Sequence, residues 1–152
     1  MKKEKYMIKA LEMAQNAFVN GEVPVGAVLV DPEKNIVVAQ ASNEMCKRQD
    51  PTQHAEMRVI REGLLGVGLQ RFLNKLDLYV TLEPCPMCAQ AISFARIRRL
   101  YFGAYDPKSG GVDHGPRIFE SSSCHHKPEI YGGIEETACA KLLKDFFKDK
   151  RG

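Results

Sequence analysis

Two cysteines three residues apart stand out, because each directly follows a proline and the pair follows an apolar run. The segment reads EPCPMC over residues 83–88, so the thiols are Cys85 and Cys88. If a helix begins at the prolines, both sulfurs lie on one face of its N-terminus. The unpaired N–H groups and partial positive charge of that end favour thiolate over thiol. A thiolate pair of this kind is a strong ligand for Zn²⁺.

Two other interpretations fit a single Cys-x-x-Cys motif. The cysteines could be small buried residues that fall close together by chance. They could also form a redox dithiol, which favours the same spacing at a helix start after a strand. Which of the three holds depends on whether further ligands are available.

The further candidates lie upstream in QHAEM, residues 53–57. His54 and Glu56 are two residues apart, so in the middle of a helix they would point about 200° apart. At a helix end the side chains can fold over the terminus toward one point, so the spacing predicts a site where two helix ends face each other. Taken singly, His54 could be a solvated helix-start residue and Glu56 a partner of the helix dipole.

A charge count favours catalytic zinc. Zn²⁺ with two thiolates and one neutral imidazole sums to zero, and three protein ligands leave a fourth position for water. The pKa of such a water falls toward about 7. Glu56 is then free to take its proton and pass it on. The order His-Ala-Glu differs from the His-Glu-x-x-His of zinc proteases, so peptide hydrolysis is not favoured.

The elements that must position these residues begin with a helix and a hairpin. Apolar spacing predicts a helix near residues 7–18, strands over 25–30 and 36–41, and a polar loop over 42–50. Asp50 is expected to cap a second helix that has Pro51 at its first position and His54 in its first turn.

The second half predicts a parallel crossover. A strand over 78–82 runs into the cysteine motif, a helix over 89–95 follows, and a strand over 100–104 comes next. A long loop over 106–128, a short strand over 129–131 and a helix from about 138 complete the chain. We therefore expect an α/β fold, with a hairpin feeding a mixed sheet and helices on both of its faces.

Composition sets broad limits. The 152 residues suggest one domain, residues 1–152, and 44% hydrophobic with 27% charged residues is ordinary for a soluble globular protein. The net charge of +3 permits a polyanionic partner without demanding one. The longest apolar run, residues 23–30, is too short to span a bilayer, and no secretory signal is visible. With five cysteines, we expect a reducing cytoplasm and no membrane contact.

Four segments resemble the bacterial tRNA-specific adenosine deaminases of the cytidine deaminase-like superfamily: EVPVGAVLV, DPTQHAEM, YVTLEPCPMCAQAI and RIRRLYFGAYDPKSG. The resemblance runs from residue 5 to about 150, and H-x-E…P-C-x-x-C is the signature of zinc nucleobase deaminases. It implies a three-layer αβα fold whose five-stranded mixed sheet lies between helices. It also implies hydrolytic deamination of the wobble adenosine of a tRNA anticodon loop to inosine, by a homodimer that builds the RNA site across its interface.

The same resemblance implies roles for single residues. His54, Cys85 and Cys88 would bind one Zn²⁺ per subunit, and Glu56 would shuttle protons. Asn43 would contact the target nucleoside, although an asparagine in a loop can equally serve to make a turn.

One stretch departs from the family pattern. Residues 111–116 read GVDHGP where many members read roughly Gly-Ala-x-Gly-Ser, and Cys124-His125-His126 follows. This stretch would border the substrate, so a zinc deaminase of a free base or nucleoside, of guanine or cytosine type, is the alternative. A non-enzymatic zinc module would need a fourth protein ligand, for which Cys46, His114 and Cys124 are the candidates. A second metal site at residues 124–126 is disfavoured because adjacent residues rarely aim at one ion. Basic clusters near residues 96–99 and 144–151 are more commonly solvated faces than RNA contacts.

Overall fold

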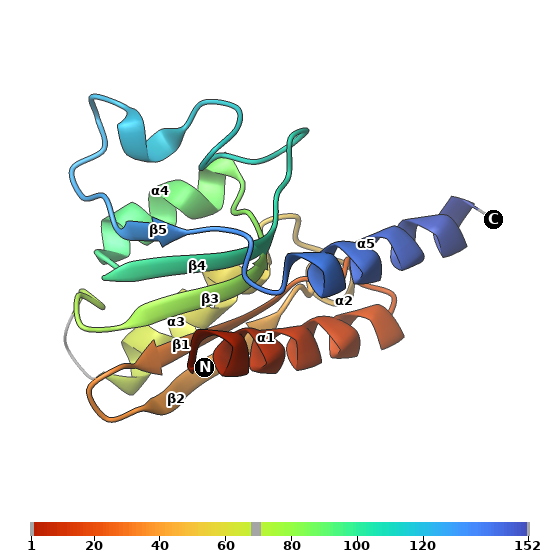
Figure 1. Cartoon of the computed structure of the whole chain (residues 1–152), viewed down its shortest axis with the longest axis horizontal. Coiled ribbons are helices and arrows are strands. Elements are labelled where there is room, and N and C mark those ends of the chain that lie inside the picture. The colour runs from red at the N-terminus through yellow and green to blue at the C-terminus, as the bar shows by residue number, and fades with distance from the viewer. Residues whose placement is uncertain (1, 68–70, 152) are drawn as a thin grey trace.

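A five-stranded mixed sheet forms the centre of the computed structural model, which describes residues 2–67 and 71–151 (Figure 1). The strand order is β2-β1-β3-β4-β5. Strand β1 is antiparallel to both β2 and β3, whereas β3, β4 and β5 run parallel to one another. The bounds are β1 Gly26–Asp31, β2 Ile36–Ser42, β3 Asp77–Leu82, β4 Arg99–Ala104 and β5 Glu129–Tyr131. The predicted hairpin and parallel crossover are both confirmed.

Helices cover both faces of the sheet, so the predicted three-layer αβα arrangement is confirmed (Figure 1). Helices α1 and α5 pack on one face, and α3 and α4 pack on the other. Two short elements lie in the connections, namely α2 and the 3-10 turn η1. The bounds are α1 Lys2–Val19, α2 Met45–Arg48, α3 Ala55–Gly66, α4 Pro86–Ala95, η1 Ile118–Glu120 and α5 Glu136–Arg151.

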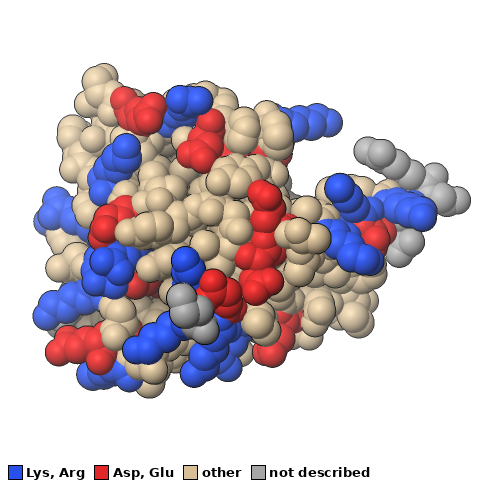
Figure 2. Space-filling view, viewed as in Figure 1, with Lys and Arg blue, Asp and Glu red and all other residues tan. Residues whose placement is uncertain are grey.

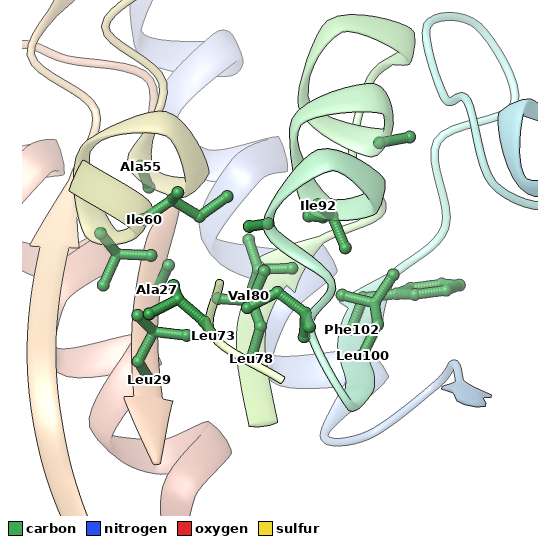
Figure 3. Close-up of a cluster of buried hydrophobic side chains, with 14 of the residues drawn as sticks. Ala27, Leu29, Ala55, Ile60, Leu73, Leu78, Val80, Ile92, Leu100 and Phe102 are labelled. Carbon is green, nitrogen blue, oxygen red and sulfur yellow. The ribbon is translucent and has the colours of Figure 1, made fainter. Parts of the chain in front are cut away.

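The larger hydrophobic core lies between the sheet and helices α3 and α4 (Figure 3). Leu78 and Val80 of β3 and Phe102 of β4 are fully buried there. They meet Ile60 of α3 and Ile92 of α4. Burial of each such side chain contributes about 1.5–3 kcal/mol, so this core fixes the two helices against the strands.

A second core joins the opposite face to α1 and α5. Its buried members include Tyr6 and Met7 of α1, Tyr79 of β3 and Cys139 of α5. The rings of Tyr79 and Tyr101 stack with centroids 4.3 Å apart across adjacent parallel strands. The sheet is therefore buried on both faces, as is typical of strands in an α/β fold.

The segment before α3 differs from the expectation in two respects. Residues 45–48 form α2 rather than continuous loop. The helix expected to start at Pro51 starts at Ala55 instead. The reason is local competition, because Asp50 Oδ1 accepts hydrogen bonds from the Thr52 N–H (2.9 Å) and the Thr52 hydroxyl (2.7 Å). These bonds close a turn over the residues that would have formed the first helical turn.

Gly26 allows helix α1 to approach β1 closely. A Cβ at this position would lie 2.1 Å from the Ala10 carbonyl oxygen and 2.5 Å from the Ala14 nitrogen. Both obstacles are backbone atoms, so neither can rotate away.

We therefore expect Gly26→Ala to lower the free energy of unfolding by about 3 kcal/mol, because overpacking forces the helix off the sheet. Urea unfolding measures the change. Gly66→Ala is the matched control, since nothing lies within 4 Å of a Cβ there and the stability should hold or rise slightly. Equal stability of the two variants would contradict the close approach.

Candidate metal centre

The ends of two helices bring the predicted metal ligands together. His54 is the N-cap of α3 (φ −73°, ψ 151°), and Cys85 is the N-cap of α4 (φ −71°, ψ 171°). Pro86 occupies the start of α4 as expected, and Cys88 lies within its first turn. The prediction that His54 lies inside the first turn of its helix is wrong, because the helix begins at Ala55, the residue after His54. In both N-caps the backbone is extended, and neither side chain caps its own helix.

The donor atoms are spaced as a tetrahedral zinc site requires. His54 Nδ1 lies 3.6 Å from Cys85 Sγ and 3.5 Å from Cys88 Sγ. With Zn–S bonds of about 2.3 Å and a Zn–N bond of about 2.1 Å, a tetrahedral angle places N and S about 3.6 Å apart. The three side chains form the group of described residues that could share a metal ion, with their donor atoms all within 4.8 Å of one another.

The protonation of the sulfurs also fits a cation. The hydrogen bond from Cys88, outweighing burial, lowers the pKa of Cys85 to about 4. The Cys85 sulfur, and then burial, raise the pKa of Cys88. His54 also has a raised pKa, chiefly through its hydrogen bond with Cys85. The two pKa values thus shift in opposite directions, as expected for two thiols in contact, and a divalent cation between the sulfurs would let both ionise.

Glu56 lies beside this group without belonging to it. The residue is 4% exposed, and its carboxyl group lies adjacent to Cys88. Burial is the main cause that raises the pKa of Glu56 to about 7. A carboxyl group with a pKa near neutrality is suited to accept and return a proton.

Asn43 is buried directly behind the start of α3. Its Oδ1 accepts a hydrogen bond of 2.7 Å from the Ala55 N–H. Asn43 thus caps the helix in place of His54, whose ring stays free to face the cysteines. Sequence reasoning missed this cap because the partners are twelve residues apart.

Two carboxylates fix the segment that carries Asn43. Glu22 is buried and accepts the N–H groups of Cys46 (3.0 Å) and Lys47 (2.8 Å). Burial opposes ionisation of Glu22, but these backbone donors outweigh it and lower its pKa. Glu44 pairs with Arg58 of α3 at 3.0 Å, which ties the same segment to the helix.

The three candidates for a fourth protein ligand lie outside the metal group. Cys46 is exposed on α2. His114 Nδ1 lies 2.8 Å from Glu83 Oε1, and Cys124 Sγ lies 3.3 Å from Ser93 Oγ. Among the residues that the structure describes, the group that could hold a metal includes none of the three.

Residues 124–126 make hydrogen bonds that attach the loop between β4 and β5 to the segment before β4. Cys124 Sγ donates to the His126 carbonyl at 3.1 Å, and His126 Nε2 lies 2.7 Å from the Ile97 carbonyl oxygen. Because both side chains bond to backbone groups, the second metal site weighed at residues 124–126 is not formed among the described residues.

Glu83 is a further buried carboxylate that sequence reasoning missed. It immediately follows β3, and its side chain is fully buried. Burial opposes its ionisation, but backbone N–H groups of the loop after β4, with the His114 side chain, lower its pKa. Its partners lie 23 to 31 residues away, so no local pattern marks them.

Fold and donor set together define a class of enzyme, the zinc-dependent deaminases. Residues 1–104 match the family described as cytidine and deoxycytidylate deaminase zinc-binding region. The chain is 50% identical over 146 residues to the tRNA-specific adenosine deaminase of Agrobacterium fabrum, covering 96% of this chain and 94% of the relative. It is 40% identical over 148 residues to the Bacillus subtilis protein of the same name, covering 97% and 90%. The chain belongs to the family of tRNA-specific adenosine deaminases, whose cofactor is zinc.

Solved structures agree with this assignment. One, from studies of A-to-I editing by tRNA:A34 deaminases at the wobble position of transfer RNA, superposes with a TM-score of 0.88 at 50% identity, covering 91% of this chain and 99% of that one. A guanine deaminase from Nitrosomonas europaea superposes with a TM-score of 0.81 at 16% identity, covering 94% and 83%. That second likeness shows the fold alone. Within the described residues, no helix has the length and apolar character needed to cross a bilayer.

The Glu22 anchor leads to a pH-dependent prediction. Its pKa is lowered in the folded state, so its stabilising effect is complete above the unfolded pKa of about 4.3 and is lost as the pH falls through the folded value. We expect Glu22→Gln to cost about 1 kcal/mol at pH 7, and the difference from the parent to shrink below about pH 4.

Urea unfolding at both pH values measures this difference. Glu33→Gln, at an exposed position in the turn between β1 and β2, is the control and should match the parent at either pH. A Glu22→Gln deficit that grew on acidification would show that the carboxylate is not the stabilising form.

Proposed function

We propose that this protein converts adenosine to inosine at the wobble position of tRNA anticodons by hydrolytic deamination. The observation that carries the proposal is the group His54, Cys85 and Cys88 at zinc-binding distances, with the buried Glu56 beside it. The choice of substrate is based on relatives named tRNA-specific adenosine deaminase, which are 40% and 50% identical over nearly the whole chain.

In this proposal His54 Nδ1 and the two sulfurs would hold the ion. Zinc there would act as a Lewis acid and lower the pKa of water to about 7. Glu56 takes a proton from the attacking water and gives it to the ring nitrogen next to the amino-bearing carbon. It then takes the remaining proton of the hydroxyl group added to that carbon and delivers it to the departing amino group, so that the C–N bond breaks, the carbonyl of inosine forms and ammonia leaves. A pKa of about 7 lets the Glu56 carboxyl act in both directions.

Asn43 is the residue we assign to the nucleoside. Its Oδ1 is committed to the Ala55 N–H, which leaves the Nδ2 amide group as a hydrogen-bond donor. The target base must be out of its stack, and the unpaired bases of an anticodon loop meet that need at low cost.

The whole chain is assigned to one domain, since every long helix packs on the same sheet. The distribution of charged side chains does not mark one surface for RNA binding. On the face shown in Figure 2, Lys and Arg are interspersed with Asp and Glu. In the basic cluster at residues 96–99, Arg98 pairs with Asp77 (2.7 Å) and Arg99 with Glu129 (2.9 Å). The substrate assignment therefore rests on the metal centre and the relatives.

The zinc-loaded protein incubated with unmodified tRNA transcripts tests the activity. We expect inosine at position 34 and no turnover of free guanine or cytosine. Glu56→Ala should retain zinc and lose roughly 10²–10⁴-fold in turnover, because only the proton carrier is removed. Asn43→Asp keeps the acceptor for Ala55 and loses the donor, so it should fold normally and raise KM.

Two outcomes would contradict the proposal. Turnover of a free base with inert tRNA would move the protein to the other deaminase class. Loss of zinc together with activity in Glu56→Ala would make that carboxylate part of the metal site.

The second partner we propose is another copy of this chain, as the family resemblance implies. Support comes from two large exposed apolar side chains, Leu65 on α3 (79% exposed) and Phe94 on α4 (68%). Both helices begin at the metal centre, so a copy seated on them would lie on the same side of the sheet as that centre.

Light scattering should give twice the chain mass of 17.0 kDa. Phe94→Asp should shift the population toward monomer, because a charge in an apolar interface is poorly solvated. Val19→Asp is the control, at a side chain 83% exposed on α1, and should stay dimeric. A monomeric parent would refute the dimer.

A further inference from the structure

The loop that follows β4 is wrapped around the carboxylate of Glu83. Glu83 Oε2 accepts the N–H groups of Val112 (3.2 Å), Asp113 (3.0 Å) and His114 (3.2 Å). Its Oε1 accepts the Asp106 N–H at 3.0 Å and lies 2.8 Å from His114 Nδ1. The side chain is fully buried, so these contacts satisfy a carboxylate that has no access to water.

The same loop presses on the turn that presents Cys85. The Gly111 N–H donates to the Pro84 carbonyl oxygen at 2.8 Å. A Cβ on Gly111 would lie 2.6 Å from the Pro86 nitrogen and 2.9 Å from the Cys85 carbonyl carbon. The backbone of the loop is therefore in direct contact with the backbone on both sides of the ligand.

Cys85 needs such support more than Cys88 does. Cys88 is buried inside α4, and the regular hydrogen bonds of the helix fix its backbone. Cys85 precedes the helix in extended conformation, with a proline on either side. Prolines carry no N–H, so this turn has few donors with which to hold itself in place.

We propose that Glu83 is a positioning residue for the metal ligand Cys85, acting through the loop of residues 106–114. The carboxylate accepts hydrogen bonds from the N–H groups of the loop, and the loop holds the turn before α4. Cys85 Sγ and His54 Nδ1 thereby keep the separation that a shared zinc ion requires. This inference rests on the zinc site of the proposed function and does not depend on the substrate.

The geometry also accounts for the unusual sequence of the loop. Asp113 contributes a backbone N–H group to Glu83 and its side chain is exposed, so that side chain is free to differ from the family pattern. Val112 also contributes its N–H group, but its side chain is buried in the larger core. Gly111 is restricted by the close approach to Pro86. His114 is the residue that adds a side-chain contact, which gives this chain one bond that a small residue in its place would not make.

The test is zinc competition on the folded holoprotein without RNA. Glu83→Gln keeps the size of the side chain, but its amide group must face N–H donors. We expect its zinc affinity, measured against a chromogenic chelator, to fall about 10–100-fold, the usual effect of losing a group that orients a metal ligand. Glu120→Gln is the matched control, since this exposed carboxylate near the same loop pairs with Arg117 at 4.0 Å on the surface, and the change should leave the affinity unchanged.

Two further variants keep the proposal decidable if Glu83→Gln does not fold. Gly111→Ala leaves the carboxylate intact and pushes the loop off the turn, so it should weaken zinc binding as strongly. His114→Ala removes one of the five contacts of the Glu83 carboxylate, so it should lower the zinc affinity less than Glu83→Gln does. Parental zinc affinity in folded Glu83→Gln, or in Gly111→Ala where the former does not fold, overturns the proposal. Absence of tRNA turnover with these zinc affinities as expected would refute the substrate and leave the positioning role intact.

Discussion

The structure depends on one electrostatic constraint, namely that two sulfurs, an imidazole and a carboxyl group lie together in a largely buried space. Two helix N-termini point at this space and supply partial positive charge. The contact between the sulfurs lowers the pKa of Cys85 and raises that of Cys88, so the two thiols do not ionise equally easily without a cation. A divalent cation bound here would favour both thiolates, and Glu56, the proton carrier in our proposal, lies beside Cys88.

Residues outside this group of side chains hold the turns that carry it in place. His54 and Cys85 are N-caps, whose carbonyl oxygens accept the first helical hydrogen bonds, from the N–H groups of Arg58 (3.0 Å) and Ala89 (2.9 Å). Their own backbone is extended and lies outside the regular helix, and distant segments add further support to both turns. Asn43 bonds to the first N–H of α3, and Gly111 bonds to the carbonyl group before Cys85. The two turns that carry His54 and Cys85 are thus supported in the same manner, each by a residue from another part of the chain. The core in Figure 3 holds helices α3 and α4 against the sheet.

Sequence reasoning predicted what local spacing encodes. The grouping of His54, Cys85 and Cys88 follows from residue type and separation, and the strands follow from apolar runs bounded by turns. The roles of these three residues and of Glu56 stay predictions. The helix start at Ala55 was missed because Asp50 and Thr52 close a turn that competes with the helix. The cap by Asn43 and the contacts of Glu83 were missed because they join segments far apart in sequence. The contact of Asn43 with the nucleoside stays a prediction.

X-ray absorption at the zinc edge of the purified protein tests the central claim most directly. The account predicts two sulfur ligands at about 2.3 Å, one imidazole nitrogen at about 2.0–2.1 Å and one oxygen ligand from water. A third sulfur or a second imidazole in place of that oxygen would contradict it, as would a protein that binds no zinc.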